Sequence, residues 1–285
     1  MMIELLKQSP VLFITAVAIL GLLIGSFLNV LVYRLPIMME RQWKTEAAEY
    51  LEQTPPKFEP FDLVKPDSAC PHCQSQIRAW QNIPVLSYIL LGGKCANCKK
   101  PISVRYPVVE TVTALLSGLI AWYFGWSIQT GFLLIFMWLT IALTLIDFDT
   151  HLLPDSLVFP LIWLGLFANL SHSFVPLEQA VVGAMAGYLS LWSIYWVFKL
   201  LTGKDGMGYG DFKLLAAFGA WFGWQALPLI ILLSALVGAV VGISLMVILS
   251  RDKNIPIPFG PYLCGAAWVY LFWGEAITVW YLGTL

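Results

Sequence analysis

The sequence predicts an all-α polytopic membrane protein with about eight transmembrane helices. Its 285 residues are 59% hydrophobic and only 12% charged, which differs strongly from an average soluble domain. Long apolar runs recur from about residue 107 to the C-terminus, and a bilayer core requires roughly 20 apolar residues per helix. We therefore expect a lipid bilayer around the chain. The formal net charge of −1 gives no reason to expect nucleic acid as a partner.

Eight apolar segments are candidates for membrane spans. We place them at about 11–33, 107–126, 129–147, 156–172, 178–199, 211–226, 228–249 and 262–282. The first segment is too long for the apolar part of a signal peptide and lacks a small-residue cleavage pattern, so we expect it to remain as a helix. The sixth segment is short, and Asp211 and Lys213 stand at its beginning.

The positions of lysine and arginine predict the orientation, because these residues accumulate in the cytoplasmic loops of membrane proteins. With eight spans, successive loops alternate between the two sides. All 16 basic residues except Lys7 then fall in or beside loops of one side: the long first loop, the loop before 211–226 and the loop before 262–282. That side is predicted to be the cytoplasm, with both termini on the opposite side.

Three regions follow from this topology. Residues 1–35 hold the first transmembrane helix, residues 36–105 form a cytoplasmic loop domain, and residues 106–285 form the membrane core. Within the loop domain, residues 38–53 are rich in Glu, Arg and Lys, and their apolar side chains have helical spacing. We expect an amphipathic helix there, ended by the prolines that follow at positions 55 and 56.

The loop domain contains two Cys-x-x-Cys pairs, Cys70 with Cys73 and Cys95 with Cys98. Four thiolates in this pattern are typical of tetrahedral structural zinc sites, which leave no open position for catalysis. Two disulfides are the alternative, but thiols stay reduced on the cytoplasmic side. His72 could replace one of the cysteines as a ligand. We expect a Zn²⁺ ion that holds the fold of the loop, and we expect the lone Cys264 to be a packing residue.

Acidic side chains within membrane helices are costly, so each is a candidate for function. Three occur between residues 145 and 155, with no Lys or Arg nearby in the sequence to neutralise them: Asp147, Asp149 and Asp155. Asp155 precedes an apolar run and fits the N-cap of the fourth span. Asp147 closes the third span, where the helix dipole disfavours a purely structural acid. Asp149 fits a solvated turn, as Asp205 fits a solvated loop. The sequence offers no account of Glu275, which falls inside the last predicted span.

Asp211 follows the segment Gly208-Tyr209-Gly210, and glycines permit close backbone approach and positive φ. This pattern can bring Asp211 against a neighbouring helix, although a flexible loop with Asp211 as the N-cap of the sixth span fits equally well. Topology favours the first interpretation, because two complete spans return Asp147 and Asp211 to the same membrane face. Two close carboxylates in low dielectric do not both ionise easily, so one can activate water while the other polarises a carbonyl.

Several motifs, taken in their order and spacing, make the chain resemble one family. They are Gly25-Ser26-Phe27-Leu28-Asn29-Val30 with Arg34 and Pro36, the paired Cys-x-x-Cys motifs, Arg105-Tyr106-Pro107 leading to Glu110, Asp147 followed by Leu153-Pro154-Asp155, Gly208-Tyr209-Gly210-Asp211, and Pro258-Phe259-Gly260-Pro261. The chain resembles the type IV prepilin peptidases, which are bifunctional leader peptidases and N-methyltransferases among the Gly-x-Gly-Asp membrane aspartyl proteases. The resemblance implies that Asp147, in preference to Asp149, and Asp211 are catalytic.

The resemblance also implies a substrate and a second reaction. The substrates would be prepilins and pseudopilins of type IV pilus and type II secretion systems, cleaved after a glycine at the cytoplasmic face of the bacterial inner membrane. S-adenosylmethionine would then methylate the new N-terminal residue. The candidates for this methyl transfer match family motifs at the cytoplasmic edge: Gly25, Asn29, Arg34 and Glu110. A packing role for Gly25 and an anchoring role for Arg34 are equally consistent.

Three other functions fit parts of the pattern. Presenilin-like and signal-peptide peptidases share Gly-x-Gly-Asp, but they have a Pro-Ala-Leu signature where this chain has Pro258-Phe259-Gly260-Pro261. A transporter could use Asp147 and Asp211 as a proton relay, although such carboxylates more often lie at mid-bilayer. A membrane transferase could bind Mg²⁺ through Asp147 and Asp149.

Overall fold

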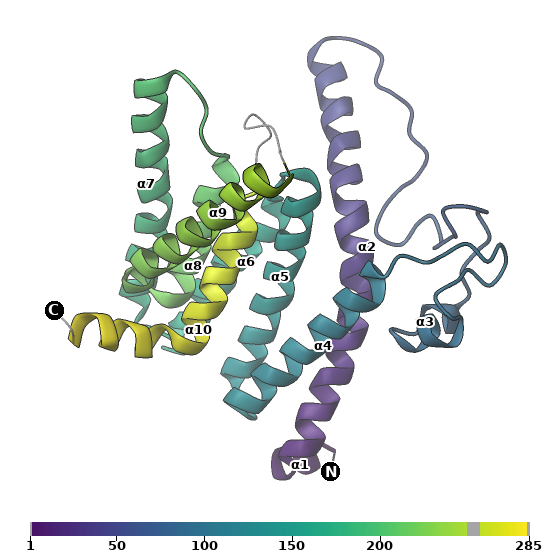
Figure 1. Cartoon of the computed structure of the whole chain (residues 1–285), viewed down its shortest axis with the longest axis horizontal. Coiled ribbons are helices and arrows are strands. Elements are labelled where there is room, and N and C mark those ends of the chain that lie inside the picture. Colours follow the sequence, from purple (N-terminus) through teal and green to yellow (C-terminus); the bar gives the residue numbers. More distant parts are fainter. Residues whose placement is uncertain (1, 250–256, 284–285) are drawn as a thin grey trace. The chain divides into compact units, whose positions relative to one another are not determined.

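The computed structural model describes residues 2–249 and 257–283, and within these ranges the regular secondary structure is helical (Figure 1). Its α-helices are α1 (Met2–Gln8), α2 (Pro10–Tyr50), α3 (Leu86–Leu90), α4 (Arg105–Phe124), α5 (Ile128–Thr150), α6 (Asp155–Leu170), α7 (Leu177–Thr202), α8 (Tyr209–Phe222), α9 (Leu227–Leu249) and α10 (Gly260–Gly283). Short 3-10 turns are η1 (Ala79–Asn82) and η2 (Trp224–Ala226). Arg251, Asp252, Lys253 and the side chain of Glu275 lie outside the described part of the chain.

A helix occupies each of the eight predicted apolar ranges. Among the described residues, five segments are long and apolar enough to cross a membrane: α2, α4, α5, α7 and Trp224–Ile248. The all-α polytopic membrane class is therefore confirmed. α6 is apolar but shorter, and the 14 residues of α8 extend only about 21 Å against a hydrocarbon core of about 30 Å. Crossing of the bilayer by α6, α8 and α10 stays a prediction.

The chain divides into two compact units, Met1–Trp138 and Leu139–Leu285. In the first unit, the 41 residues of α2 extend about 60 Å, twice the hydrocarbon thickness. The expectation of a separate span and amphipathic helix was therefore wrong, because one helix contains both. Proline removes one backbone hydrogen bond, but Pro36 is buried inside α2 without ending it. The helix ends at Tyr50, ahead of the predicted prolines.

α2 and α4 pack closely because small residues line their contact (Figure 1). A Cβ atom on Gly25 would lie 2.7 Å from Glu110 Cα, and one on Gly21 would lie 2.9 Å from Ala114 Cα. The buried hydroxyl of Ser117 donates to the Thr113 carbonyl at 2.7 Å, within α4 itself. This hydroxyl is therefore satisfied by its own helix, as a nonpolar environment requires.

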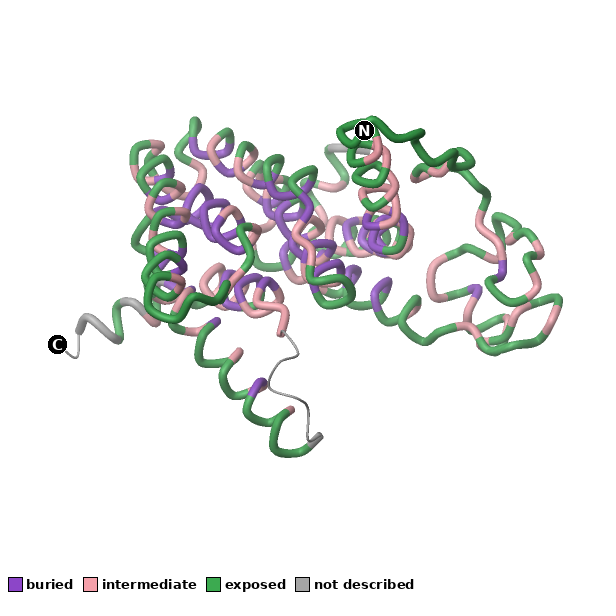
Figure 2. The backbone as a smooth tube through the Cα atoms, turned by 90° about the horizontal axis from the view of Figure 1, so that it is seen from above, coloured by how far each residue is buried: buried purple, intermediate pink, exposed green. Residues whose placement is uncertain are grey.

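In the second unit, α8 packs against both α6 and α7 and is buried along almost its whole length. Figure 2 shows the buried stretches of the backbone in purple. Trp221 is fully buried and donates its indole N–H to the Leu161 carbonyl at 2.8 Å. The buried amide of Asn169 donates to the carbonyls of Ala220 and Trp221 at 2.9 and 3.2 Å. These contacts hold the C-terminal end of α8 against α6.

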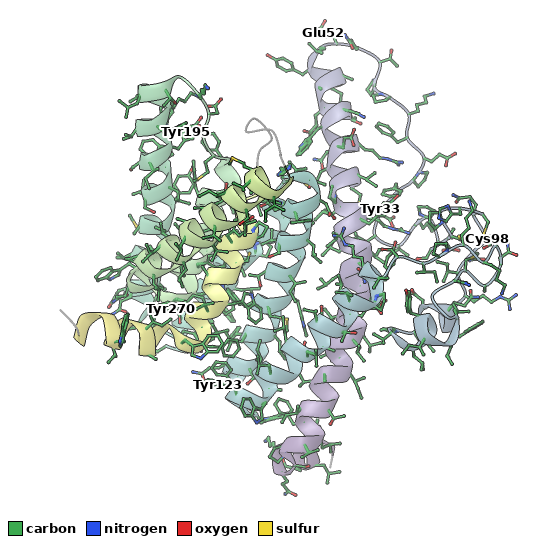
Figure 3. The ribbon with its side chains drawn as sticks, in the orientation of Figure 1. Tyr33, Glu52, Cys98, Tyr123, Tyr195 and Tyr270 are labelled. Carbon is green, nitrogen blue, oxygen red and sulfur yellow. The ribbon has the colours of Figure 1, made fainter. Side chains whose placement is uncertain are left out.

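Many side chains on the outer faces of these helices are apolar and exposed, among them Leu115, Trp122, Trp163, Phe167, Leu189 and Val240. Such surfaces would be unfavourable in water and are expected where lipid surrounds a helix. The loop 51–104 differs, because most of its residues are exposed and many are polar. Figure 3 shows Glu52 just beyond the end of α2 and Cys98 farther along this loop.

Candidate active site and metal centre

Asp147 lies in the last turn of α5 and is only 5% exposed. Gly260, the first residue of α10, donates its backbone N–H to Asp147 Oδ2 at 2.9 Å. A Cβ atom on Gly260 would lie 2.7 Å from the same oxygen, closer than side chains normally approach. The glycine of Pro258-Phe259-Gly260-Pro261 therefore permits a direct backbone contact with the carboxylate, a contact that the motif alone does not indicate.

Asp211 is the third residue of α8 and is 7% exposed. The interpretation of Asp211 as an N-cap was wrong, because the helix begins two residues earlier and Gly208 occupies the N-cap position. Within the described part of the chain, Asp211 Oδ1 is buried and has no hydrogen-bond partner. The charge of Asp147 acts on Asp211, so the fold brings these two predicted residues close to each other.

Leu153 connects the three segments of this site. A Cβ atom on Gly210 would lie 2.8 Å from Leu153 Cβ, and one on Gly260 would lie 3.1 Å from Leu153 Cδ2. Leu153 is half-buried in the turn between α5 and α6. Its side chain thus packs against the glycine beside Asp211 and the glycine that contacts Asp147, which explains why both positions lack a side chain.

Asp155 and Lys213 form an ion pair, with Lys213 Nζ at 2.7 Å from Oδ1 and 2.9 Å from Oδ2 of Asp155. The N-cap role predicted for Asp155 was wrong, because α6 begins at Asp155 and its N-cap is Pro154. No Lys or Arg is near the three aspartates in the sequence, but the fold supplies one for Asp155. Lys213 is distant from Asp155 in sequence, but α8 brings it to the start of α6.

Asp149 is exposed, whereas Asp147 is buried. Residues two apart on a helix point in different directions, so α5 does not direct these two carboxylates toward a common ion.

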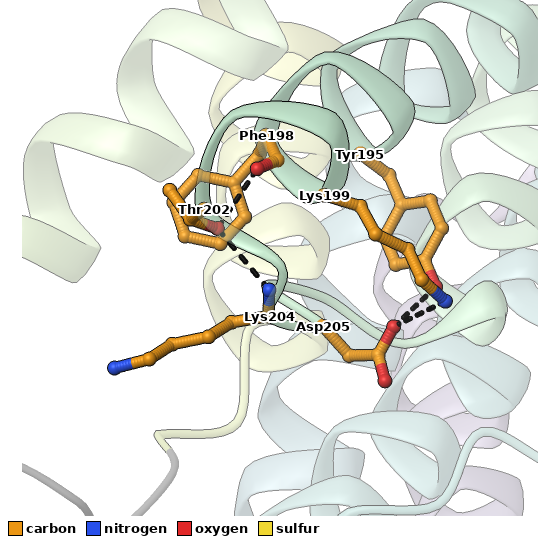
Figure 4. A network of polar contacts seen from close by, with 6 residues as sticks. All are labelled: Tyr195, Phe198, Lys199, Thr202, Lys204 and Asp205. Atoms are coloured by element: carbon orange, nitrogen blue, oxygen red, sulfur yellow. Dashed lines mark hydrogen bonds and ion pairs between the residues drawn. The ribbon is translucent and has the colours of Figure 1, made fainter.

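Asp205 is solvent-exposed, as predicted, but it also has partners (Figure 4). Lys199 Nζ lies 2.8 Å from Asp205 Oδ1, and the Tyr195 hydroxyl donates to that oxygen at 2.6 Å. These hydrogen bonds, with that of Lys199 dominant, lower the pKa of the Asp205 carboxyl. The Tyr195 ring also packs against Tyr209 and Phe212, at centroid distances of 5.4 and 5.7 Å. The network therefore links the end of α7 to the loop that precedes Asp211.

The four predicted metal ligands come together in the first unit: the sulfur atoms of Cys70, Cys73, Cys95 and Cys98 all lie within 4.8 Å of one another. All five cysteines of the chain are free thiols. Cys70 Sγ and Cys98 Sγ are 3.8 Å apart, which matches the edge of about 3.8 Å expected for a tetrahedron with zinc–sulfur bonds of about 2.3 Å. The exposed His72 is not among the grouped ligands. The donor set fits one tetrahedral ion.

The two Cys-x-x-Cys turns have matching backbones. Each is closed by an isolated antiparallel bridge, between Ala69 and Gln76 in one and between Lys94 and Pro101 in the other. The residue after the second cysteine has a positive φ in both turns, 57° at Gln74 and 59° at Lys99. In the first turn, the hydrogen bond between Cys73 and Ser75 at 3.0 Å lowers the pKa of the Cys73 thiol to about 6. This favours the thiolate, which is the form that binds metal.

The structure brings together three of the four residues predicted for methyl transfer. Asn29 donates to the carbonyls of Gly25 and Tyr106, both at 3.2 Å, and Gly25 packs on Glu110. Arg34 is occupied elsewhere. Its guanidinium donates to the carbonyls of Asp62 and Pro66 at 2.9 and 2.6 Å.

Glu110 is buried and has a partner that the sequence did not indicate. The backbone N–H of Val85 donates to Glu110 Oε2 at 2.7 Å. Val85 has a φ of 59°, which is rare and unfavourable for a β-branched residue. No local sequence signal identifies this contact, because the two residues lie in different segments.

Comparisons with known proteins agree with this arrangement. The bacterial peptidase A24 N-terminal domain matches residues 19–124, and the type IV leader peptidase family matches residues 134–243. The chain belongs to the type IV leader peptidase family. A relative from Pseudomonas aeruginosa, named prepilin leader peptidase/N-methyltransferase, is 56% identical over 99% of this chain and 97% of its own length.

Other members of this family with the same name are also similar over most of their length. One from Neisseria gonorrhoeae is 54% identical over 88% of this chain and 87% of its own, and one from Legionella pneumophila is 46% identical over 94% and 93%. No solved structure matches the chain. Family membership and the candidate membrane helices together indicate a bacterial inner-membrane enzyme.

Proposed function

We propose that this enzyme cleaves the leader peptides of type IV prepilins and pseudopilins with Asp147 and Asp211, and then methylates the new N-terminus. One observation supports the peptidase site above all others. A buried, unpartnered oxygen of Asp211 lies near Asp147, whose own carboxylate accepts a backbone N–H from Gly260. An orphaned buried carboxylate oxygen is costly in a protein interior and is expected where a substrate or water supplies the missing partner.

The geometry supports general acid–base hydrolysis. One carboxylate takes a proton from water as the water oxygen bonds to the scissile carbonyl carbon, while the other, protonated, donates to the carbonyl oxygen. The C–N bond then breaks as the amide nitrogen takes up a proton. The products are a leader with a free carboxyl group and a mature chain with a free amine. Gly260 contributes by holding Asp147 in one orientation.

The active site is proposed to face the cytoplasm of the bacterial inner membrane, as the distribution of Lys and Arg predicts. Asp205 and Lys204 stand in the short polar loop between α7 and α8, so this loop would lie on the same side as residues 51–104. Trypsin added to inverted inner-membrane vesicles should cleave at the exposed Lys57, which lies outside the cysteine cluster, whereas spheroplasts should protect this position. Cleavage in spheroplasts alone would reverse the orientation.

The methyl-transfer region is proposed to be the contact between α2 and α4. Among the described residues of the first unit, Glu110 is the buried acid, and a carboxylate is suited to hold a cationic amine or sulfonium. S-adenosylmethionine would supply the methyl group. The N-terminal amine would form the new N–C bond, releasing a proton and S-adenosylhomocysteine. Methylation of a pre-cleaved pilin should be lost in Glu110→Gln and persist in Asp211→Asn; loss in both would indicate a shared site.

The cysteine cluster is proposed to bind Zn²⁺ and to stabilise the loop domain, with no role in bond cleavage. Four thiolate ligands would complete the tetrahedral coordination of the ion. Metal analysis of protein purified without chelator should find about one zinc per chain. A preparation that lacks zinc and is fully active would contradict this assignment.

The aspartate pair is tested by prepilin cleavage in detergent with Asp147→Asn, Asp211→Asn and Asp149→Asn. The first two variants should lose at least about 1,000-fold in rate because each removes one partner of the acid–base pair, while Asp149→Asn should remain active. Full cleavage by the Asp147 or Asp211 variant would refute the pair. Loss in Asp149→Asn together with inhibition by chelator would favour the alternative of a metal held by Asp147 and Asp149.

A further inference from the structure

The ion pair between Lys213 and Asp155 stands apart from the residues to which the proposed reaction assigns a task. Lys213 follows Asp211 by two positions near the beginning of α8, and Asp155 is the first residue of α6. Their side chains are 26% and 51% exposed. Lys213 donates to both carboxylate oxygens of Asp155, and its ammonium group lies 5.3 Å from the centre of the Phe159 ring, also on α6. Lys213 therefore contacts two residues of α6, Asp155 and Phe159.

The beginning of α8 holds the segment 147–155 at three points. Asp211 interacts with Asp147 at one end of the segment, Gly210 packs against Leu153, and Lys213 binds Asp155 at the other end. Residues two apart on a helix point in different directions, so Asp211 and Lys213 contact different parts of the segment. Together these contacts constrain both the rotation of α8 about its axis and its position along that axis, relative to the segment 147–155.

We propose that Lys213 and Asp155 are positioning residues that set the placement of the Asp211 carboxylate relative to Asp147. The inference rests on the proposed function, because it assumes that this pair of aspartates cleaves the prepilin. Lys213 acts through the helix that it shares with Asp211 and does not contact the reacting atoms. A partly exposed ion pair adds little to stability, but small displacements of catalytic groups have large effects on rate.

The test is a double-mutant cycle on prepilin cleavage with Lys213→Met, Asp155→Asn and the double variant. Each single variant should lower kcat about tenfold with KM unchanged, since misplacement by a fraction of an ångström affects the reacting groups and leaves substrate binding intact. The double variant should be no slower than either single variant, because the pair acts as one unit. Losses that multiply in the double variant, or single variants with full kcat, would overturn the proposal.

Charge reversal separates positioning from a direct effect of the lysine charge on Asp211. Asp155→Lys combined with Lys213→Asp restores the pair but places a negative charge beside Asp211. Positioning predicts that kcat recovers to within about threefold of wild type, as Lys213→Arg should also do. A charge-swapped variant no faster than the single variants would overturn the proposal in favour of the charge itself.

Two further variants make the outcome decisive. Lys204→Met removes an exposed lysine from the loop before α8 and should leave kcat unchanged. Asp211→Asn, measured alongside, reports on the proposed function independently. If Asp211→Asn still cleaves, the catalytic pair itself is refuted. If Asp211→Asn is inactive and Lys213→Met is fully active, only the positioning role fails. Thermal unfolding of each variant must stay near wild type for the comparison of rates to hold.

Discussion

The cysteine cluster and the aspartate site are assembled in opposite ways. All four thiols come from one loop, and each Cys-x-x-Cys pair sits in a turn closed by its own backbone bridge. The aspartate site draws on three segments distant in sequence, at the end of α5 and the beginnings of α8 and α10. Its geometry depends on helix packing, and glycines lie where a side chain would collide.

This difference bears on what each site tolerates. The cysteine turns lie in an exposed loop, so the surrounding backbone could adjust while four strong ligands held the proposed ion. Residues around Asp147 and Asp211 lie in a close-packed interior, where even one added carbon requires other atoms to move. Metal binding at the loop site should therefore depend mainly on the four cysteines themselves. Activity at the helical site should depend also on the residues that position the two carboxylates.

The largest effect is expected from removing a metal ligand. Cys95→Ser should lower bound metal from about one ion per chain to background and make residues 67–103 sensitive to trypsin, because structural zinc contributes about 10 kcal/mol or more to the folded state of a small domain. Metal analysis and limited proteolysis measure both. Cys264→Ser is the matched control, since Cys264 is buried in α10 and should retain the metal. Equal metal content in the two variants would contradict the assignment.

The next effect comes from one added carbon at the aspartate site. Gly260→Ala should reduce prepilin cleavage about 100-fold, since its Cβ would lie 2.7 Å from Asp147 Oδ2 and would displace either the carboxylate or the N–H that binds it. Gly265→Ala, on the same helix, has nothing within 4 Å of the added carbon and should cleave normally. Metal content should be unchanged in both. Equal activity of the two variants would show that the backbone contact is dispensable.

The contrast also explains what the sequence could predict. The clustering of the four cysteines was predictable because their spacing is local and the fold needed only to close two turns. The aspartate pair required an argument from topology and a family resemblance, since neither segment alone distinguishes a functional acid from a cap. The ion pair of Lys213 with Asp155 was missed because its partners meet only after α6 and α8 pack.

The end of a helix was predictable only where the change from apolar to polar residues coincides with the end of the helix. The change from apolar to charged residues after position 33 indicated the end of a helix, but α2 continues through Pro36 to Tyr50. Composition reports where the bilayer ends, whereas the backbone hydrogen bonds of a helix can continue into water. The strained backbone at Val85, which binds Glu110, had no sequence signal because a positive φ at valine contradicts the local preference.

A smaller effect distinguishes the two glycines that precede Asp211. Gly210→Ala should lower cleavage about tenfold, because its Cβ would lie 2.8 Å from Leu153 Cβ and must shift α8 or the turn before α6. Gly208→Ala should be nearly neutral, since the nearest atom to its added carbon is Asp211 Oδ2 at 3.8 Å, an ordinary contact. Initial rates for both variants provide the comparison. A greater loss in Gly208→Ala would place the sensitive contact on the loop side of Asp211.

The smallest effect is expected at Asp205, which tests how far the sensitive region extends. Asp205→Asn should change cleavage at neutral pH by no more than about twofold, because an exposed ion pair contributes little. Its pKa is lowered in the folded protein, so its stabilising contribution is present at neutral pH and is lost as the pH falls through the folded pKa. Thermal unfolding from neutral to acidic pH should show this loss in wild type and not in Asp205→Asn. A tenfold loss of cleavage would instead mean that the Tyr195–Lys199–Asp205 network also holds Asp211 in place, and the tightly constrained region would then extend from the packed helices into a solvent-exposed loop.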